Sequence, residues 1–457
     1  MKRLPFILLF LVALDTARPP ITLNAAPVFP QQGQGRLSNQ VAEQRRQDAL
    51  KALKINPDDP AANYQLGLIA LGQGKPAEAL PFFEKVHLLR AADIPPLTGI
   101  LECQLLLHRR QVVLQTVQTL KGLLRPQDPS LFEVASLLAF HQEYAEAIPI
   151  LERIRKVRPD SFDVNYNLAL AYFQSKQYAR SAQVLEPLLK RQPRAEAYNL
   201  LAMAEEEGGR YLAAVRSFQK AAEMEPGDEG FRFDYAYELL KHRTDQAAIA
   251  IFVSGVRDFP NSGRMRLGLG TAYYLAARPE EAAKELLEAI RIEPGMAFAF
   301  FLLGKLYDSA ESSQASIEQA LRVYLESGPK DAWAFYHYAN ILQQLARLEP
   351  TPNFQPARAN LHRALQLKPD FAEAQLQLGI MEQQEGRYVE SIPILEKALQ
   401  FDPSLGLAHF RLGQAYKRLG QTEKAQAEYD LFEQLKPQAE SDKDRRTVIQ
   451  FLVEPRK

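Results

Sequence analysis

The sequence predicts an all-α fold in which pairs of antiparallel helices stack into a solenoid. Three observations predict it: a small residue recurs every 33 to 35 residues along most of the chain, apolar residues follow it at helical spacing, and a proline closes most of the periods. A fixed period of this length is typical of stacked supersecondary units. The 457 residues are therefore predicted to form one repeat array rather than several unrelated domains.

The recurring small residue indicates where the two helices of a pair cross closely. Glycine costs about 1 kcal/mol relative to alanine inside a helix. A larger side chain at a close crossing would cost about 1–3 kcal/mol by overpacking, which can outweigh the cost of glycine. The series consists of Gly67, Ala135, Ala169, Ala202, Ala236, Gly270, Gly304, Ala339, Gly379 and Gly413, with Leu101 as its one large member.

A second small residue follows twelve positions later, and an apolar residue comes four positions after that. These pairs are Ala79 and Phe83, Ala147 and Leu151, Ser181 and Leu185, Ala214 and Phe218, Ala248 and Phe252, Ala282 and Leu286, Ser391 and Leu395, and Ala425 and Tyr429. The i, i+4 spacing predicts one face of an amphipathic helix. Proline cannot continue a helix, so the second helices should end near Pro159, Pro193, Pro226, Pro260, Pro294, Pro329, Pro369, Pro403 and Pro437.

The period divides the chain into a leader, an array and two end segments. Residues 27–59 read as a linker followed by a capping half-unit, and residues 60–437 as eleven helix pairs. The pairs start near residues 60, 94, 128, 162, 195, 229, 263, 297, 332, 372 and 406, and a six-residue insert near 348–353 separates the two helices of the ninth. Residues 438–457 are predicted to form a capping helix whose apolar edge, Val448 and Leu452, covers the last unit.

Residues 1–26 are predicted to be an export signal. Lys2 and Arg3 precede an apolar run over residues 4–14, which is too short to span about 30 Å of hydrocarbon as a helix. A basic start followed by a short apolar core is typical of a secretory signal. We expect cleavage near residues 23–26 and a periplasmic or secreted protein. The alternative is an uncleaved anchor, and membrane contact is expected at most through this segment.

The units resemble the tetratricopeptide repeat family, most closely over residues 372–403 and 408–437. The resemblance extends over residues 60–437. It implies a right-handed superhelix whose first helices line a groove, with contacts at positions 2, 5, 9 and 12 of each unit. It also implies binding of peptide segments or other proteins in that groove.

Large aromatic residues mark one part of this expected groove. The family often has an acidic residue at position 2, whereas this chain has Phe298 and Trp333 there in consecutive units. Exposed aromatic patches indicate an interaction surface. The predicted partner-binding residues are Phe233, Tyr237, Tyr274, Phe298, Phe301, Trp333 and Tyr336. The alternative is that these rings pack between neighbouring units.

The sequence offers no pattern for catalysis, a cofactor or a metal. The seven histidines include no i, i+4 pair on one helix, and neither a Walker loop nor a G-x-S-x-G motif is present. The single cysteine, Cys103, lies in an apolar helical stretch and reads as a buried small residue. Lys and Arg (55) balance Asp and Glu (55), so the overall charge gives no signal for nucleic acid.

These observations predict a non-enzymatic scaffold that binds other proteins or extended peptides. Two alternatives remain open at this stage. The first is a structural or assembly subunit of a cell-envelope secretion, pilus or polysaccharide-export complex. The second is a carbohydrate-associated tetratricopeptide protein.

Overall fold

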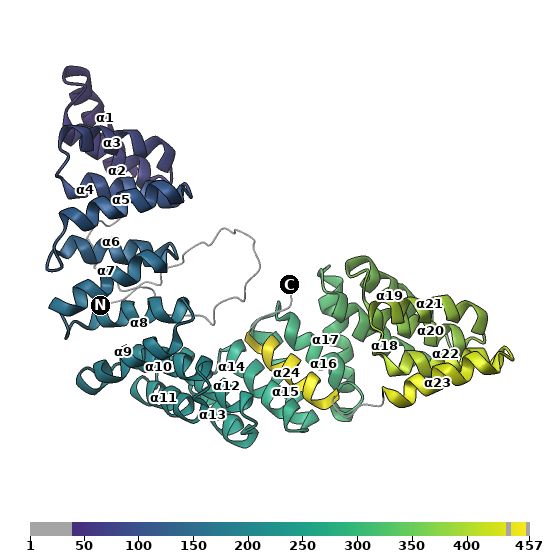
Figure 1. Cartoon of the computed structure of the whole chain (residues 1–457). Coiled ribbons are helices and arrows are strands. Elements are labelled where there is room, and N and C mark those ends of the chain that lie inside the picture. The colour runs from purple at the N-terminus through teal and green to yellow at the C-terminus, as the bar shows by residue number, and fades with distance from the viewer. Residues whose placement is uncertain (1–38, 436–439, 454–457) are drawn as a thin grey trace. The chain divides into compact units, whose positions relative to one another are not determined.

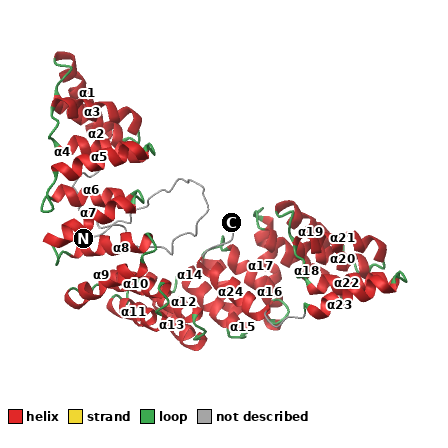
Figure 2. Cartoon of the chain, in the orientation of Figure 1, coloured by secondary structure: helices red, strands yellow, loops and turns green. Residues whose placement is uncertain are grey.

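The computed structural model describes residues 39–435 and 440–453, and within them every regular element is a helix (Figures 1 and 2). The prediction of an all-α solenoid is therefore confirmed. The predicted export signal at residues 1–26 lies outside the described residues. Among the helices of the described part, none is both long and apolar enough to cross a membrane.

The described residues fall into two compact units, with the boundary between Phe231 and Arg232. We call them the N-terminal unit and the C-terminal unit. The N-terminal unit contains α1 (Asn39–Ile55), α2 (Pro60–Gly72), α3 (Pro76–Leu89), α4 (Ile94–Leu106), α5 (Arg110–Leu123), α6 (Pro129–Phe140), α7 (Tyr144–Val157), α8 (Phe162–Gln174), α9 (Tyr178–Arg191), α10 (Ala195–Glu207) and α11 (Tyr211–Met224).

The C-terminal unit takes in most of α12 (Glu229–Lys241) and every later helix. These are α13 (Asp245–Asp258), α14 (Gly263–Leu275), α15 (Pro279–Ile292), α16 (Ala297–Leu306), the 3₁₀ turn η1 (Glu311–Ser313), α17 (Gln314–Glu326), α18 (Ala332–Arg347), α19 (Gln355–Leu367), α20 (Ala372–Gln384), α21 (Tyr388–Phe401), α22 (Gly406–Arg418), α23 (Thr422–Gln434) and α24 (Glu440–Val453). The insert near 348–353 lies in the link between α18 and α19.

The small residues lie where the helices of a pair approach closely. A Cβ atom on Gly413 would come within 2.6 Å of Cε1 of Tyr429, the residue sixteen positions later on the paired helix. A Cβ atom on Gly379 would meet Cδ2 of Leu395 at 2.6 Å. These distances are far shorter than a carbon–carbon contact. Glycine at these positions therefore allows the first helix to pack directly against a bulky residue of the second.

Two glycines of α2 give a matched test of this packing. A Cβ atom on Gly67 would lie 2.7 Å from Phe83, whereas nothing lies within 4 Å of the corresponding point on Gly72. Gly67→Ala should lower the free energy of unfolding by about 1–3 kcal/mol through overpacking. Gly72→Ala should raise it, by up to about 1 kcal/mol, because alanine is the better helix former. Urea denaturation followed by circular dichroism measures both, and shifts of the same sign would contradict the crossing geometry.

The position of α24 corrects one prediction. Val448 and Leu452 were expected to cover the last unit of the array. Both are buried, but α24 packs on α14 (Figure 1). The ring of its Phe451 contacts Phe298 of α16. The helix therefore buries its apolar edge against aromatic first helices in the middle of the C-terminal unit. At the other end of the chain, Ala49 of α1 packs with Ala62 and Leu66 of α2.

Candidate partner-binding pocket

The C-terminal unit contains an open pocket of about 650 Å³ that aromatic side chains surround. We call it the aromatic pocket. The residues that line it come from α16, α17, α18, α24, the end of α19 and the segment before α18. They are Ala297, Phe298, Phe301, Tyr324, Lys330, Asp331, Ala332, Trp333, Leu367, Lys368 and Phe451. The pocket includes three of the seven residues predicted to bind a partner: Phe298, Phe301 and Trp333.

Trp333 is placed at the pocket by the start of α18. Asp331 caps this helix, because its carboxylate accepts hydrogen bonds from the backbone N–H of Trp333 at 3.0 Å and of Ala334 at 3.2 Å. The half-buried indole packs against Phe371, with ring centroids 4.5 Å apart, and edge-to-face on Phe301 at 5.3 Å. The ring therefore both lines the pocket and joins neighbouring repeats.

Phe298 and Phe301 on α16 form a second part of the pocket wall. Their rings stack with centroids 6.0 Å apart, and Phe451 of α24 lies edge-to-face on both, at 6.0 and 6.2 Å. Phe298 and Phe301 are only 7% and 5% exposed. A helix from the C-terminus of the chain thus completes the aromatic wall.

The other predicted residues lie elsewhere. Tyr336 packs edge-to-face on Trp333 at 5.8 Å and at a tilt on Phe371 at 5.2 Å, and burial raises the pKa of its phenol. Tyr237 on α12 and Tyr274 on α14 are half-buried and do not line the pocket. Phe233 is a correction: it is fully buried, with its ring edge-to-face on Phe252 at 5.5 Å. For Phe233 the alternative, packing within the array, is the right one.

Two lysines lie at the pocket among these rings. The ammonium group of Lys368 is 4.9 Å from the Phe371 ring centroid and 5.6 Å from that of Trp333, within the range of a cation–π interaction. Lys330 is exposed and lines the pocket directly before the Asp331 cap. The aromatic pocket therefore combines apolar walls with a net positive charge, because the two lysines outnumber the single carboxylate of Asp331.

The other end of α24 is held at the turn between α12 and α13. Arg445 donates from Nη2 to the carbonyl of Leu240 at 2.8 Å and from Nη1 to Asp245 at 3.0 Å, and Nη2 also bonds the second carboxylate oxygen of Asp245. Thr244 stabilises this turn by donating its hydroxyl to the Leu239 carbonyl at 2.6 Å. A bidentate ion pair between a guanidinium and a carboxylate fixes both the position and the orientation of the arginine side chain.

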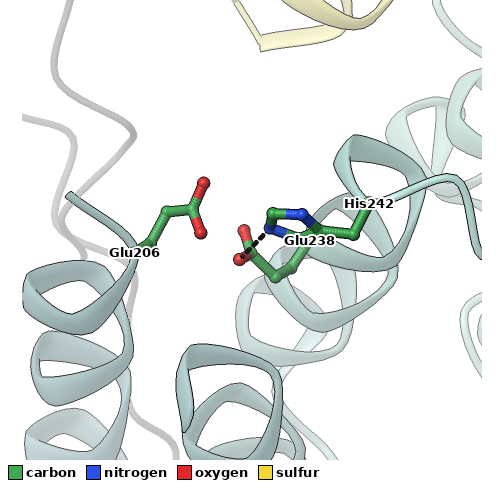
Figure 3. Close-up of side chains that lie close together, drawn as sticks. All are labelled: Glu206, Glu238 and His242. Atoms are coloured by element: carbon green, nitrogen blue, oxygen red, sulfur yellow. Dashed lines mark hydrogen bonds and ion pairs between the residues drawn. The ribbon is translucent and has the colours of Figure 1, made fainter. Parts of the chain in front are cut away.

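Helix α12 also carries a buried carboxylate, Glu238, close to the Leu240 carbonyl that Arg445 binds. Glu238 is buried, with Nε2 of His242 at 3.1 Å from its Oε1 (Figure 3). Nζ of Lys241 lies 3.5 Å from its Oε2. Both partners follow it on the same helix, where residues three and four positions apart are neighbours. The helix therefore provides its own polar partners for this carboxylate, one of them the ammonium group of Lys241, and we assign the group a structural role.

The sequence did not reveal several residues that build this site. Lys330, Lys368 and Phe371 lie in the links that join helices, where the repeat pattern carries no requirement for charge or aromatic rings. Phe451 lies next to the apolar edge, Val448 and Leu452, that the sequence predicted within residues 438–457. Nothing in the repeat pattern indicated on which helices that edge would pack. Arg445 and Asp245 are separated by 200 residues.

The chemistry of the pocket suits burial of an apolar side chain. The Asp331 carboxylate caps α18, and the hydroxyl of Tyr324 lies 3.4 Å from it. Burial and then the charge of Asp331 raise the pKa of Tyr324 to about 12, so the phenol stays protonated at neutral pH.

In the N-terminal unit, burial raises the pKa of the buried Cys103 to about 12, which keeps the thiol in its weakly nucleophilic form.

Comparisons with known proteins agree with this architecture. The chain is similar to the TPR repeat-containing protein YpiA of Bacillus subtilis strain 168, with 22% identity over 392 residues that cover 85% of this chain and 73% of that protein. It is also similar to human Protein O-mannosyl-transferase TMTC1, with 26% identity over 162 residues. That match covers 35% of this chain but only 18% of the human protein.

Two solved structures are similar to this chain at low identity. Yeast Tom70 matches with a TM-score of 0.40 and 16% identity, covering 91% of this chain and 92% of that one. The C-terminal part of a TPR repeat-containing protein from Cytophaga hutchinsonii matches with a TM-score of 0.46 and 15% identity, covering 53% of this chain and 97% of that one.

Family models give the assignment. Four models described as tetratricopeptide repeat match residues 49–80, 141–204, 195–228, 236–297, 353–405 and 383–441, which together make up more than half of the chain. The 34-residue period, the helix pairs and these matches show that the chain belongs to the tetratricopeptide repeat family.

Proposed function

We propose that this chain is a non-enzymatic protein-binding scaffold and that its aromatic pocket holds an apolar segment of a partner protein. The observation that carries the proposal is the open space of about 650 Å³ bounded by Phe298, Phe301, Trp333 and Phe451. Aromatic anchors that enter such pockets supply much of the binding energy at protein interfaces. The tetratricopeptide fold, which commonly mediates protein interactions, supports the same function.

The charges around the pocket favour one kind of partner. Lys330 and Lys368 add positive charge, and the carboxylate of Asp331 is engaged in capping α18. A partner with acidic residues beside its apolar anchor would be attracted to this surface and oriented on it. We do not propose nucleic acid as a ligand, because the chain as a whole is neutral. The basic and apolar start of the sequence supports action outside the cytoplasm.

Site-specific photo-cross-linking tests the proposal. A photoreactive phenylalanine derivative in place of Lys330 would lie at the pocket, and the same residue in place of Val323, which is 55% exposed on α17, serves as the control. We expect the chain labelled at position 330 to form a cross-link with one discrete partner in its native host. The control chain labelled at position 323 should not form this cross-link. Mass spectrometry of the product should identify an apolar segment. Equal cross-linking from both positions, or none from position 330, would contradict a partner at the aromatic pocket.

A further inference from the structure

The helix α24 occupies the surface next to the aromatic pocket in the manner of a bound ligand. We propose that α24 is a reversible occupant of this surface, and that the partner of the scaffold is an amphipathic helix that replaces it. This inference rests on the proposed function, because it names the class of partner that the pocket receives and how access to it is controlled.

The contacts of α24 follow a pattern by which one helix recognises a groove. Arg445 binds Asp245 and the Leu240 carbonyl at one end, and Phe451 covers Phe298 and Phe301 at the other. Along the same stretch, Val448, Ile449 and Leu452 are buried. These positions fall on one face of a helix, as in complexes where an amphipathic helix binds through residues at i, i+3, i+4 and i+7.

The attachment of α24 involves few neighbouring elements. Among the described helices, α24 has its main backbone packing on α14 alone, whereas most repeat helices pack both on their paired helix and on a neighbouring pair. Over residues 445–453, where its side chains are described, the buried ones are Val448, Ile449 and Leu452. Elements with few buried apolar contacts open at lower free energy than the core of a domain. The helix can therefore leave the surface while the array stays folded.

The contacts of α24 also define what would replace it. The partner helix needs a basic residue to meet Asp245, aliphatic residues three and four positions later, and an aromatic residue that lies over Phe298 and Phe301. The chain holds its own helix close to the surface, which gives α24 a high effective concentration there. A partner must overcome this advantage, so α24 makes the surface selective for helices that bind more tightly.

A peptide of residues 440–457 is the probe for this inference. The full chain with Arg445→Asp and Phe451→Ala should release its own helix. Fluorescence anisotropy should then show the labelled peptide binding to this variant about 10-fold more tightly, or better, than to the wild-type chain, whose surface is occupied by a tethered competitor. Equal affinity for the two chains would overturn the proposal.

A charge reversal gives a second test that does not depend on truncating apolar side chains. In Asp245→Arg the ion pair with Arg445 becomes a repulsion, so α24 should dissociate. This variant should bind a peptide carrying Arg445→Asp more tightly than the unmodified peptide, and combining both substitutions in one chain should restore weak peptide binding. No preference between the two peptides, with an unchanged melting curve, would also overturn the proposal. Loss of cross-links at position 330 alone would contradict the proposed function and leave these results standing.

Discussion

Phe252→Ala should lower the free energy of unfolding of the C-terminal unit by about 3–5 kcal/mol, the usual range for removing a fully buried phenylalanine. Phe252 is fully buried on α13 and packs edge-to-face with Phe233 at 5.5 Å. On its other side, a Cβ atom on Gly268 would come within 2.3 Å of the ring. Glycine has no side chain that could move into the space left by the ring, so a cavity should remain and the cost should be high.

Val253→Ala is the matched control for this prediction. Val253 is the next residue on α13 and is 45% exposed, so its truncation should change the free energy of unfolding by no more than about 0.5 kcal/mol. Urea denaturation followed by circular dichroism measures both variants. A repeat array need not unfold in a single step, so the transition of the C-terminal unit should be compared rather than the mean midpoint. A shift below about 1 kcal/mol for Phe252→Ala would show that the neighbouring helices close the cavity.

The periodic part of the fold could be predicted because its contacts are local. Gly413 meets Tyr429 within a single helix pair, and the same sixteen-residue relation links Gly379 with Leu395. Such contacts repeat with the sequence, so a recurring residue type indicates a recurring position in the structure. This explains why units expected near residues 60 and 372 begin with helices at Pro60 and Ala372.

The candidate site was less predictable because it depends on contacts outside the repeat. Phe233 and Trp333 were both expected in the groove, yet Phe252 and the guanidinium of Arg264, 3.8 Å from its ring, enclose Phe233. Trp333 stays half-buried at the pocket. The apolar edge of α24 shows only that the helix needs a partner surface. Its choice of α14 and α16 depends on an aromatic wall and a carboxylate that are distant in sequence.

Trp333→Ala should weaken binding of the partner segment by about 2 kcal/mol or more, which is about a 30-fold loss of affinity. The indole provides a large rigid wall of the aromatic pocket, and an aromatic ring buries much area for little loss of conformational entropy. The segment identified through the cross-link at position 330 is the ligand for this measurement. In the wild-type chain Trp333 is the single tryptophan, so its emission should shift to the blue and its quenching by iodide should fall when the segment binds.

Trp333 also packs between repeats, so a second variant must separate binding from stability. Tyr336→Ala is suited to this, because Tyr336 contacts the same neighbours, Trp333 and Phe371, but does not line the pocket. Both variants should melt at lower temperature than the wild type, since each removes an aromatic contact. Of the two variants, only Trp333→Ala should lose most of its affinity for the partner segment, because only this substitution removes a surface that the ligand touches. An equal loss of affinity in both variants would mean that binding depends on the packing of α18 rather than on contact with the indole, and the aromatic pocket would then lose its central anchor.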